Sequence, residues 1–227
     1  MIDFHCHFLP QIDDGAGSVE ESVWILNELK GQNIDTVCAT PHFNGEKTDI
    51  EDFLQNRQTA FEKVKPFAKD INIVLGAEVL ITPRLLKIKE MKRLCAGGSR
   101  CILLEMPYGP WQQWMFDVVL RAEEMNLIPV IAHPERYYEG NSLFKYTRFF
   151  KMEKIYMQFN ADTFLSMRGR GTVKKILKNE TVLPIMGSDA HNKTWRKPKI
   201  EVANKKILRC FGEEIYRKFE NNAKIIL

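Results

Sequence analysis

The feature that most constrains this chain is a regular alternation of short apolar runs with amphipathic stretches. The apolar runs are rich in aliphatic and β-branched residues and are too short for helices, so they predict strands. These runs span residues 2–7, 36–40, 71–79, 101–106, 128–133, 155–160 and 182–189. The order of strand, helix and strand repeats along the chain, which indicates βα units.

The stretch after the first run shows the helical pattern most clearly. Ser18 is followed three residues later by Glu21, a capping box that predicts the start of a helix. Apolar residues then recur at helical spacing as far as Gly31, and we expect them to face the core: Val19, Val23, Leu26 and Leu29. From Pro198 onward the pattern predicts one or two closing helices.

Each predicted strand ends in a polar residue, at intervals close to the roughly 30 residues of a βα unit. These residues are His7, His42, Glu78, Glu105, His133, Asn160 and Asp189. Repeated βα units form parallel strands, either in an open doubly wound sheet or in a closed barrel. An open sheet gathers only a few strand ends at one point, whereas a barrel brings all of them to one mouth. The sequence therefore predicts an α/β barrel of seven strands.

Composition excludes several classes of protein. The hydrophobic content of 44% and the charged content of 27% describe an ordinary globular chain. A net charge of +4, without a long basic stripe, does not indicate nucleic acid. No apolar run approaches the roughly 18 residues that span a bilayer, and the N-terminus lacks a signal-peptide pattern. We expect a cytoplasmic, single-domain protein over residues 1–227, without membrane insertion; the oligomeric state stays open.

The five cysteines form no CxxC pair, which indicates reduced thiols rather than a disulfide framework or a zinc ribbon. The segment CAGGSR, from Cys95 to Arg100, resembles the loop in which thiolate phosphatases hold a phosphate group. That loop has one residue more between its Cys and its Arg and leads into a helix, whereas this segment leads into a predicted strand. We therefore reject Cys95 as a nucleophile.

All of the histidines lie at or just beyond predicted strand ends: His5, His7, His42, His133 and His191. A single histidine at a strand end is more often structural than a ligand, but this concentration with interleaved acids favours a metal site. His5 and His7 are two residues apart on a strand, so their side chains project to the same face. Asp189 and His191 repeat this spacing at the last strand.

Two acids strengthen this interpretation, because Glu78 and Glu105 lie in apolar strands where an unpaired carboxylate is costly. The candidate ligands are His5, His7, Asp14, His42, Glu78, Glu105, His133, Asp189 and His191. This set exceeds the needs of one ion, so we infer two or three divalent ions with a bridging carboxylate; Mn, Fe, Zn and Mg all suit the ligands. Asp14 is preferred to Asp13 because Gly15 permits a tight turn.

Such a cluster lowers the pKa of bound water to about 7 and promotes displacement at a tetrahedral centre, which predicts a hydrolase. Arg136, in HPERY, and Arg196, in HNKTWR, lie just beyond candidate ligands. Their forked donors can hold the oxygens of a phosphoryl group. The alternative for each arginine is a surface salt bridge.

Seven short motifs together carry a resemblance to a known family: HCH, IDDG, ATPH, GAE, LLE, AHPERY and GSDAHN. In this order and spacing, the chain resembles the polymerase and histidinol phosphatase (PHP) superfamily. Within it, the chain is similar to the bacterial manganese-dependent protein-tyrosine phosphatases of the CpsB/YwqE type. The resemblance covers essentially the whole chain and implies a distorted, TIM-like (β/α)7 barrel with a trinuclear metal site.

The resemblance also implies roles for individual residues. The first ion would be held by His5, His7, Glu78 and Asp189, the second by Glu78, Glu105 and His133, and the third by Asp14, His42 and His191. Glu78 would then be the bridging ligand, and Mn²⁺ the metal. Arg136 and Arg196 match the phosphate-contacting arginines of the family, which act beside a hydroxide that bridges the ions.

The substrate that the resemblance implies is phosphotyrosine on the tyrosine-rich tail of a bacterial tyrosine kinase that controls capsule or exopolysaccharide synthesis. A phenol, with a pKa near 10, leaves with little help from a general acid. Tyr108, Trp111 and Trp114 could line a groove for the aryl ring or pack within the barrel.

Three alternatives remain open. The same fold could hydrolyse histidinol phosphate or another small phosphomonoester. An amidohydrolase-like barrel also begins with HxH, but its pattern ends in a lone Asp, whereas here His191 follows Asp189 and an acid stands at Glu105. The third alternative is a non-catalytic binding domain. It is disfavoured because a metal-ligand set that leaves coordination positions open is typical of a catalytic site.

Overall fold

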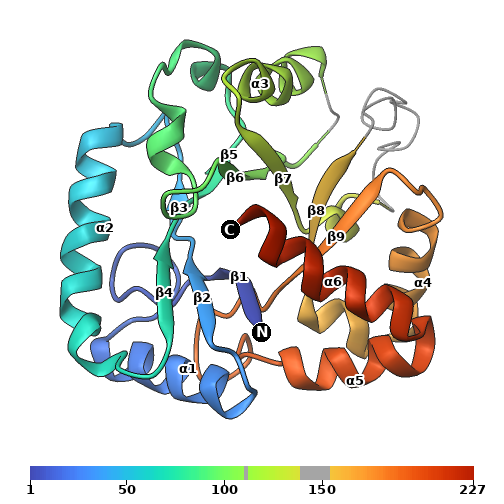
Figure 1. The fold of residues 1–227 in the computed structure, drawn as a ribbon. Helices are drawn as coiled ribbons and strands as arrows, with labels where there is room; N and C mark the ends of the chain where they lie inside the picture. The colour runs from blue at the N-terminus through green and yellow to red at the C-terminus, as the bar shows by residue number, and fades with distance from the viewer. Residues whose placement is uncertain (110–111, 139–153) are drawn as a thin grey trace.

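The computed structural model describes residues 1–109, 112–138 and 154–227 (Figure 1). Its strands are β1 (Ile2–Cys6), β2 (Thr36–Ala39), β3 (His42–Phe43), β4 (Asn72–Leu75), β5 (Glu78–Leu80), β6 (Cys101–Glu105), β7 (Ile128–Ala132), β8 (Ile155–Asn160) and β9 (Val182–Gly187). Its α-helices are α1 (Val19–Gly31), α2 (Ile50–Val64), α3 (Gln113–Glu124), α4 (Met167–Ile176), α5 (Ile200–Phe211) and α6 (Glu213–Ile226). Short 3₁₀ helices connect them: η1 (Lys65–Phe67), η2 (Pro83–Lys87), η3 (Met91–Leu94), η4 (Pro134–Arg136) and η6 (Ala161–Leu165).

The strands form two parallel sheets. One has the order β1-β2-β4 and the other β3-β5-β6-β7-β8-β9. This arrangement confirms the predicted α/β fold with parallel strands. Strand pairing within the described residues falls into these two sheets rather than into one closed ring, so the predicted barrel closure stays a prediction.

The structure has more strands than the seven predicted, because one short strand lies beyond a predicted run and one predicted strand is interrupted. Strand β3 lies just beyond the second predicted strand, after Pro41, which has no N–H to give to a ladder, and the third predicted strand breaks at Gly76. Hydrogen bonds join the two irregular segments to each other: Gly76 N donates to Ala39 O (2.8 Å) and Glu78 N donates to Pro41 O (3.1 Å). The strands are therefore split between two sheets, but hydrogen bonds still hold the segments around Pro41 and Gly76 side by side.

The first strand meets the last one at the end where the candidate ligands lie. Cys6 forms a parallel bridge with Ala190. Asp189 N donates to His5 O (2.7 Å), and His7 N donates to Ala190 O (2.9 Å). Segments almost two hundred positions apart in the sequence are thus held side by side by backbone hydrogen bonds.

Strand β1 carries an irregularity that simple alternation does not predict. Its register with β2 shifts between Asp3 and Cys6, so that one extra residue lies in β1. Bulges of this kind re-aim side chains and are common beside active sites. The bulge includes His5, a candidate ligand.

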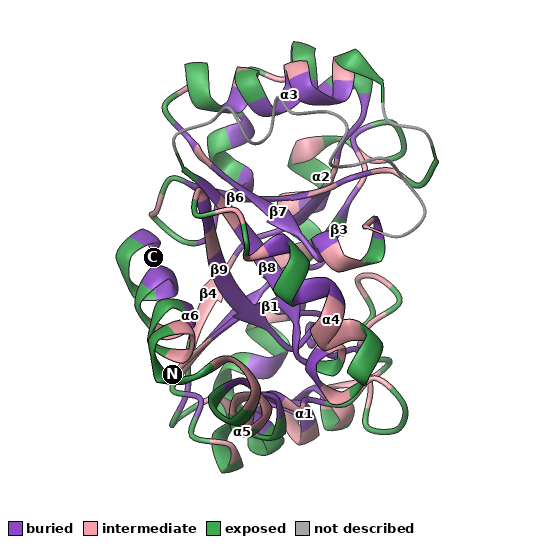
Figure 2. Ribbon diagram, turned by 90° about the vertical axis from the view of Figure 1, so that its right-hand side faces the viewer, coloured by how far each residue is buried: buried purple, intermediate pink, exposed green. Residues whose placement is uncertain are grey.

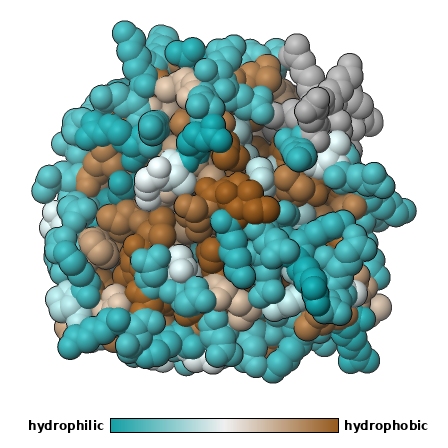
Figure 3. All heavy atoms as spheres, in the orientation of Figure 1, coloured by the Kyte–Doolittle hydropathy of each residue, from teal (hydrophilic) through white to brown (hydrophobic). Residues whose placement is uncertain are grey.

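Helices surround the strands, which are buried almost throughout, while exposed residues gather on the outer sides of the helices (Figure 2). The two closing helices are confirmed as α5 and α6. Helix α6 packs against β9 and β1, and Asn222 Nδ2 donates to Pro184 O (3.0 Å). On the face that carries the C-terminus, apolar side chains gather near the centre within a hydrophilic rim (Figure 3). Among the described residues, none of the helices is both long and apolar enough to cross a bilayer.

The predicted first helix is confirmed as α1, with two corrections. Ser18 Oγ accepts from Glu21 N (3.3 Å), but the Glu21 carboxylate accepts from Gly17 N (3.0 Å), so only half of the capping box forms. Leu26 and Leu29 are buried as expected. The predicted stripe is wrong at its start, because Ile25 is buried whereas Val19 and Val23 are only half-buried.

Candidate metal centre

All nine candidate ligands come together at one end of the strands, in four overlapping groups. Within each group, one potential ligand atom from every residue lies within 4.8 Å of the others. The groups are His7, Asp14, His42 and His191; His5, His7 and Asp189; His5, Glu78 and His133; and His42, Glu78 and Glu105. The structure therefore brings together every residue in the set predicted from the sequence.

Glu78, the first residue of β5, lies at the centre of this cluster and is 1% exposed. Its Oε2 lies 3.2 Å from Nε2 of His5 and 3.2 Å from Nε2 of His7. Its Oε1 lies 2.7 Å from Nε2 of His133, and Oε2 lies 3.0 Å from Nδ1 of His42. Four imidazole rings thus face one buried carboxylate, the arrangement that a bridging ligand requires.

The rings of His5 and His7 are oriented by oxygen atoms behind them. Nδ1 of His5 lies 2.7 Å from Oε1 of Gln158, and Nδ1 of His7 lies 2.7 Å from Oδ2 of Asp13. These acceptors favour the proton on Nδ1 and leave a lone pair on each Nε2. The two Nε2 atoms are 2.9 Å apart. With both rings neutral, two lone pairs at this distance repel each other. A proton held between them, in line with the raised pKa of His5, or a metal cation relieves this repulsion, so the pair fits a cation.

The pKa values indicate a surplus of negative charge in the cluster. Burial lowers the pKa of His5, but the charges of Glu78 and Asp189 outweigh it and raise that pKa to about 9. Burial and the nearby charge of Glu78 raise the pKa of Glu105 to about 7. Both shifts express the cost of holding several carboxylates in a dry site, a cost that divalent cations would relieve.

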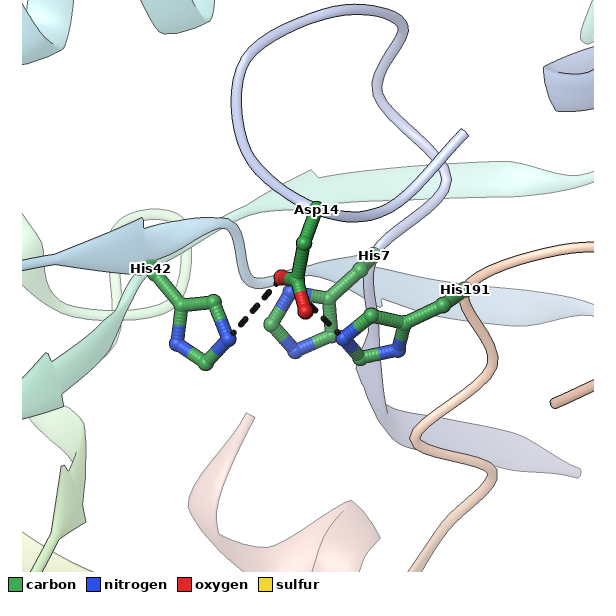
Figure 4. Close-up of side chains that lie close together, drawn as sticks. All are labelled: His7, Asp14, His42 and His191. Atoms are coloured by element: carbon green, nitrogen blue, oxygen red, sulfur yellow. Dashed lines mark ion pairs between the residues drawn. The ribbon is translucent and has the colours of Figure 1, made fainter. Parts of the chain in front are cut away.

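Asp14 reaches over the rings of His7, His42 and His191 from the loop after β1 (Figure 4). Its Oδ1 lies 3.3 Å from Nε2 of His42 and 3.5 Å from Nε2 of His191, and its side chain is 65% exposed. Nδ1 of His191 lies 3.0 Å from Asp189 O, which accepts its proton. Nε2 of His191 is buried and has no hydrogen-bond partner among the described residues. That orphaned nitrogen faces Asp14 and fits a metal ligand.

Two candidate ligands have unusual backbone conformations. His133 follows β7 with φ of 31°, and Asp189 follows β9 with φ of 51°. Positive φ costs free energy in residues other than glycine and persists where the surroundings enforce it, often at functional sites. The His133 side chain contacts Glu78, and Oδ1 of Asp189 lies 3.7 Å from Nε2 of His5 and 3.6 Å from Nε2 of His7, so both side chains face the ligand cluster.

The two candidate arginines meet on one buried carboxylate, that of Asp189. Nη2 of Arg196 donates to Oδ1 of Asp189 (2.6 Å), and Nη2 of Arg136 donates to Oδ2. Burial raises the pKa of Asp189, but the charges of His5 and Arg136 outweigh it and hold that pKa well below its usual range. Asp189 is only 4% exposed, so these pairs are not surface salt bridges, and both guanidinium groups lie at the edge of the ligand cluster.

Sequence reasoning missed Gln158, which connects several parts of the site. Its Oε1 faces His5, its Nε2 donates to Asn160 Oδ1 (2.9 Å), and Asn160 Nδ2 donates to Asp189 Oδ2 (2.6 Å). Gln158 and Asn160 are two positions apart on β8, so they share a face. Polar residues at this spacing in a buried strand were the available signal.

The remaining residues singled out from the sequence, one cysteine and three aromatic residues, have different outcomes. Cys95 is buried, and burial raises the pKa of its thiol to about 12, which agrees with its rejection as a nucleophile. Tyr108 lines a pocket beside the arginines. Trp114 instead lines a separate pocket with Arg84 and Lys87, and its Nε1 donates to Gln112 Oε1 (2.8 Å). Trp111 lies outside the described residues.

A family model for capsular polysaccharide synthesis, CpsB/CapC, matches residues 1–227. The chain belongs to the CpsB/CapC family. This membership confirms the predicted resemblance to the CpsB/YwqE type.

Individual relatives of this CpsB/CapC chain carry similar names. The tyrosine-protein phosphatase CpsB of Streptococcus pneumoniae is 28% identical over 100% of this chain and 98% of its own length. The tyrosine-protein phosphatase YwqE of Bacillus subtilis is 26% identical over 100% of this chain and 91% of its own length. The family therefore spans the whole chain rather than one segment of it.

The fold of this CpsB/CapC member also matches a solved structure. The crystal structures of YwqE from Bacillus subtilis and CpsB from Streptococcus pneumoniae are described as those of unique metal-dependent tyrosine phosphatases. The match covers 100% of this chain and 94% of the other, with a TM-score of 0.85 and 24% identity. This likeness supports the mixed α/β fold with parallel sheets.

Proposed function

We propose that this protein is a metal-dependent protein-tyrosine phosphatase, a phosphoric monoester hydrolase. The observation that carries the proposal is the convergence of nine residues with nitrogen and oxygen ligand atoms, Glu78 among them, beside two arginines on Asp189. A metal cluster beside guanidinium groups suits a phosphate ester, because both can neutralise its charge. The names of the CpsB and YwqE relatives point to the same activity.

The residues fit a site for two or three divalent ions, most simply Mn²⁺, with Fe, Zn or Mg as alternatives. His5, His7, Glu78 and Asp189 would hold the first, Glu78, Glu105 and His133 the second, and Asp14, His42 and His191 the third. The converging lone pairs of His5 and His7 and the orphaned nitrogen of His191 support this fit. When bound, such ions lower the pKa of a coordinated water to about 7.

The chain's own residues would bind and orient the phosphate ester. Arg136 and Arg196 would contact the phosphoryl oxygens, and their shared contact with Asp189 holds both guanidinium groups toward the same point. Because phenolate is a good leaving group, the site needs no dedicated general acid. An alkyl phosphate such as phosphoserine lacks this advantage.

The remaining parts of the proposal rest on the resemblance. We propose that residues 1–227 form one domain whose two sheets together make a distorted (β/α)7 barrel, supported by the bridge between Cys6 and Ala190. The partner would be the tyrosine-rich tail of a bacterial tyrosine kinase that controls capsule or exopolysaccharide synthesis, in the cytoplasm. The family description, capsular polysaccharide synthesis, agrees with this role.

The deciding experiment combines metal analysis of the purified protein with matched phosphotyrosine and phosphoserine peptides. We expect bound divalent metal and Mn²⁺-stimulated cleavage that favours phosphotyrosine. His133→Ala should reduce this cleavage by more than about 100-fold. Cys95→Ser, the matched control, should retain full activity.

Other outcomes point elsewhere. Full activity of the His133→Ala protein would contradict the metal mechanism. Faster turnover of histidinol phosphate than of the phosphotyrosine peptide would favour a small phosphomonoester as substrate. Hydrolysis of an amide or a lactone without phosphatase activity would favour the amidohydrolase alternative.

A further inference from the structure

A pocket of about 430 Å³ opens beside the two arginines. Its lining includes Arg136, Asp189 and Arg196, which belong to the site already described, and two aromatic residues, Tyr108 and Trp195. Both aromatic side chains are mostly exposed, Tyr108 at 76% and Trp195 at 71%. Two large rings thus stand in water at the rim of the proposed phosphate site.

Trp195 is carried by a loop whose backbone is tightly held. Oδ1 of Asn192 accepts from the backbone N–H groups of Thr194, Trp195 and Arg196, each at 3.1 Å. His191 N donates to Arg196 O (2.9 Å), which closes the loop. The exposure of the indole is therefore not the result of a loose segment. The Arg196 guanidinium carbon also lies 5.7 Å from the centroid of the indole ring system, within range of a cation–π contact.

Tyr108 approaches the same pocket from the segment after β6. Its ring centroid lies 5.9 Å from that of Tyr137, and Tyr137 lies 5.8 Å from the ring of His133. Tyr137 is only 1% exposed. A row of rings therefore leads from the metal centre, through a buried tyrosine, to an exposed one at the pocket.

Single exposed aromatic residues are common on protein surfaces. Tyr108 and Trp195 differ because they come from distant parts of the chain and line one pocket with both arginines. The arginines supply positive charge for a phosphate, and the exposed rings supply apolar faces beside it. A ligand that joins a phosphate to an aromatic ring is the one that uses both features.

We propose that Tyr108 and Trp195 form an aryl-binding subsite that contacts the ring of phosphotyrosine and makes the site favour aryl over alkyl phosphates. This inference rests on the proposed function and adds the residues that determine its specificity. Ring contacts of this kind change affinity by about two- to tenfold each. An alkyl phosphate has no ring to place against Tyr108 or Trp195 and gains no ring contact from them.

The test compares phenylphosphonate with methylphosphonate, two phosphate analogues that are not hydrolysed. Calorimetric titration of the Mn²⁺-loaded protein should show tighter binding of the phenyl compound. Trp195→Ala and Tyr108→Ala should each reduce that preference by about two- to tenfold, with little change in methylphosphonate binding. Trp195→Phe should keep most of the preference.

Phe67→Ala is the matched control, because Phe67 is an exposed aromatic residue in η1, at 57%, and is not among the residues that line this pocket. This control should leave the preference unchanged. Equal binding of the two phosphonates by the unaltered protein, or an unchanged preference in both alanine variants, would overturn the aryl subsite while leaving the phosphatase intact. Failure to bind either phosphonate, together with absence of Mn²⁺-dependent phosphatase activity, would overturn the proposed function and the subsite with it.

Discussion

Oδ2 of Asp13 lies 2.7 Å from Nδ1 of His7 and 3.0 Å from the backbone N of His42, so one carboxylate orients two parts of the metal centre. Asp13→Asn keeps the shape but removes the charge that holds the proton on Nδ1 of His7. We expect Mn²⁺ affinity to fall by about 10- to 100-fold with the number of bound ions unchanged at saturation. Titration calorimetry with metal analysis measures both quantities.

Asp14→Asn is the matched comparison. Asp14 faces His42 and His191 directly, so this substitution should lower the number of bound ions rather than only the affinity. Loss of an ion from Asp13→Asn, with full occupancy in Asp14→Asn, would reverse the roles assigned to the two aspartates.

The arginine pair on Asp189 predicts a link between metal and stability. In the metal-free protein, Arg196→Ala leaves Oδ1 of the buried Asp189 without a strong donor, which should lower the free energy of unfolding by about 1–3 kcal/mol. Bound Mn²⁺ would neutralise the same carboxylate, so the loss should shrink. Denaturant unfolding of the variant and the unaltered protein, in a chelator and in Mn²⁺, checks this difference. An equal loss of unfolding free energy in a chelator and in Mn²⁺ would show that Asp189 is not a metal ligand.

The sequence predicted the ligand set well because most of the ligands lie at or just beyond the end of an apolar run; Asp14, in the loop after the first run, was chosen for its place before Gly15. His5 and Glu78 needed no knowledge of their partners to be singled out. Gln158 was missed because its spacing from Asn160 shows only that the two share a face of a buried strand, whereas its contact with His5 joins residues 153 positions apart. The short strand after Pro41, the strand break at Gly76 and the bulge in β1 were missed for a similar reason, since register depends on neighbouring strands.

Glu135 predicts a specific pH dependence of stability. The residue is half-buried, but Oε2 of its carboxylate is buried. Its Oε1 accepts from Asn160 N and Thr163 Oγ1, both at 2.8 Å, and burial of the carboxylate raises its pKa from 4.5 to about 7. Between these values the folded protein holds the proton more tightly than the unfolded chain. Protonation of Glu135 therefore adds to the free energy of unfolding as the pH falls through 7. This added stability reaches its full value, up to about 3 kcal/mol, below about pH 4.5.

Glu135→Gln mimics the protonated carboxyl group and should remove this part of the pH dependence. We expect the variant to be more stable than the unaltered protein at pH 8 and to differ little from it at pH 4.5. Chemical unfolding in a chelator, at several pH values, measures the difference. Parallel pH profiles for the two proteins would show that Glu135 does not titrate in this range.

Gly15 is predicted to be essential to the loop that carries Asp13 and Asp14, for a steric reason. A Cβ at Gly15 would lie 2.1 Å from the carbonyl O of His7 and 2.7 Å from its Cβ. The loop cannot retreat freely, because Ala16 N donates to His7 O (3.0 Å). Gly15→Ala should therefore destabilise the metal-free protein by about 1–3 kcal/mol and weaken Mn²⁺ binding, since both aspartates move away from their histidines.

Gly17→Ala, two residues further along the same loop, is the matched control. The nearest atom to a Cβ at Gly17 is Oε2 of Glu21 at 3.6 Å, an ordinary contact. Thermal unfolding and Mn²⁺ titration should therefore leave Gly17→Ala close to the unaltered protein and separate it clearly from Gly15→Ala. Equal behaviour of the two variants would mean that close packing against His7 does not hold the loop in place.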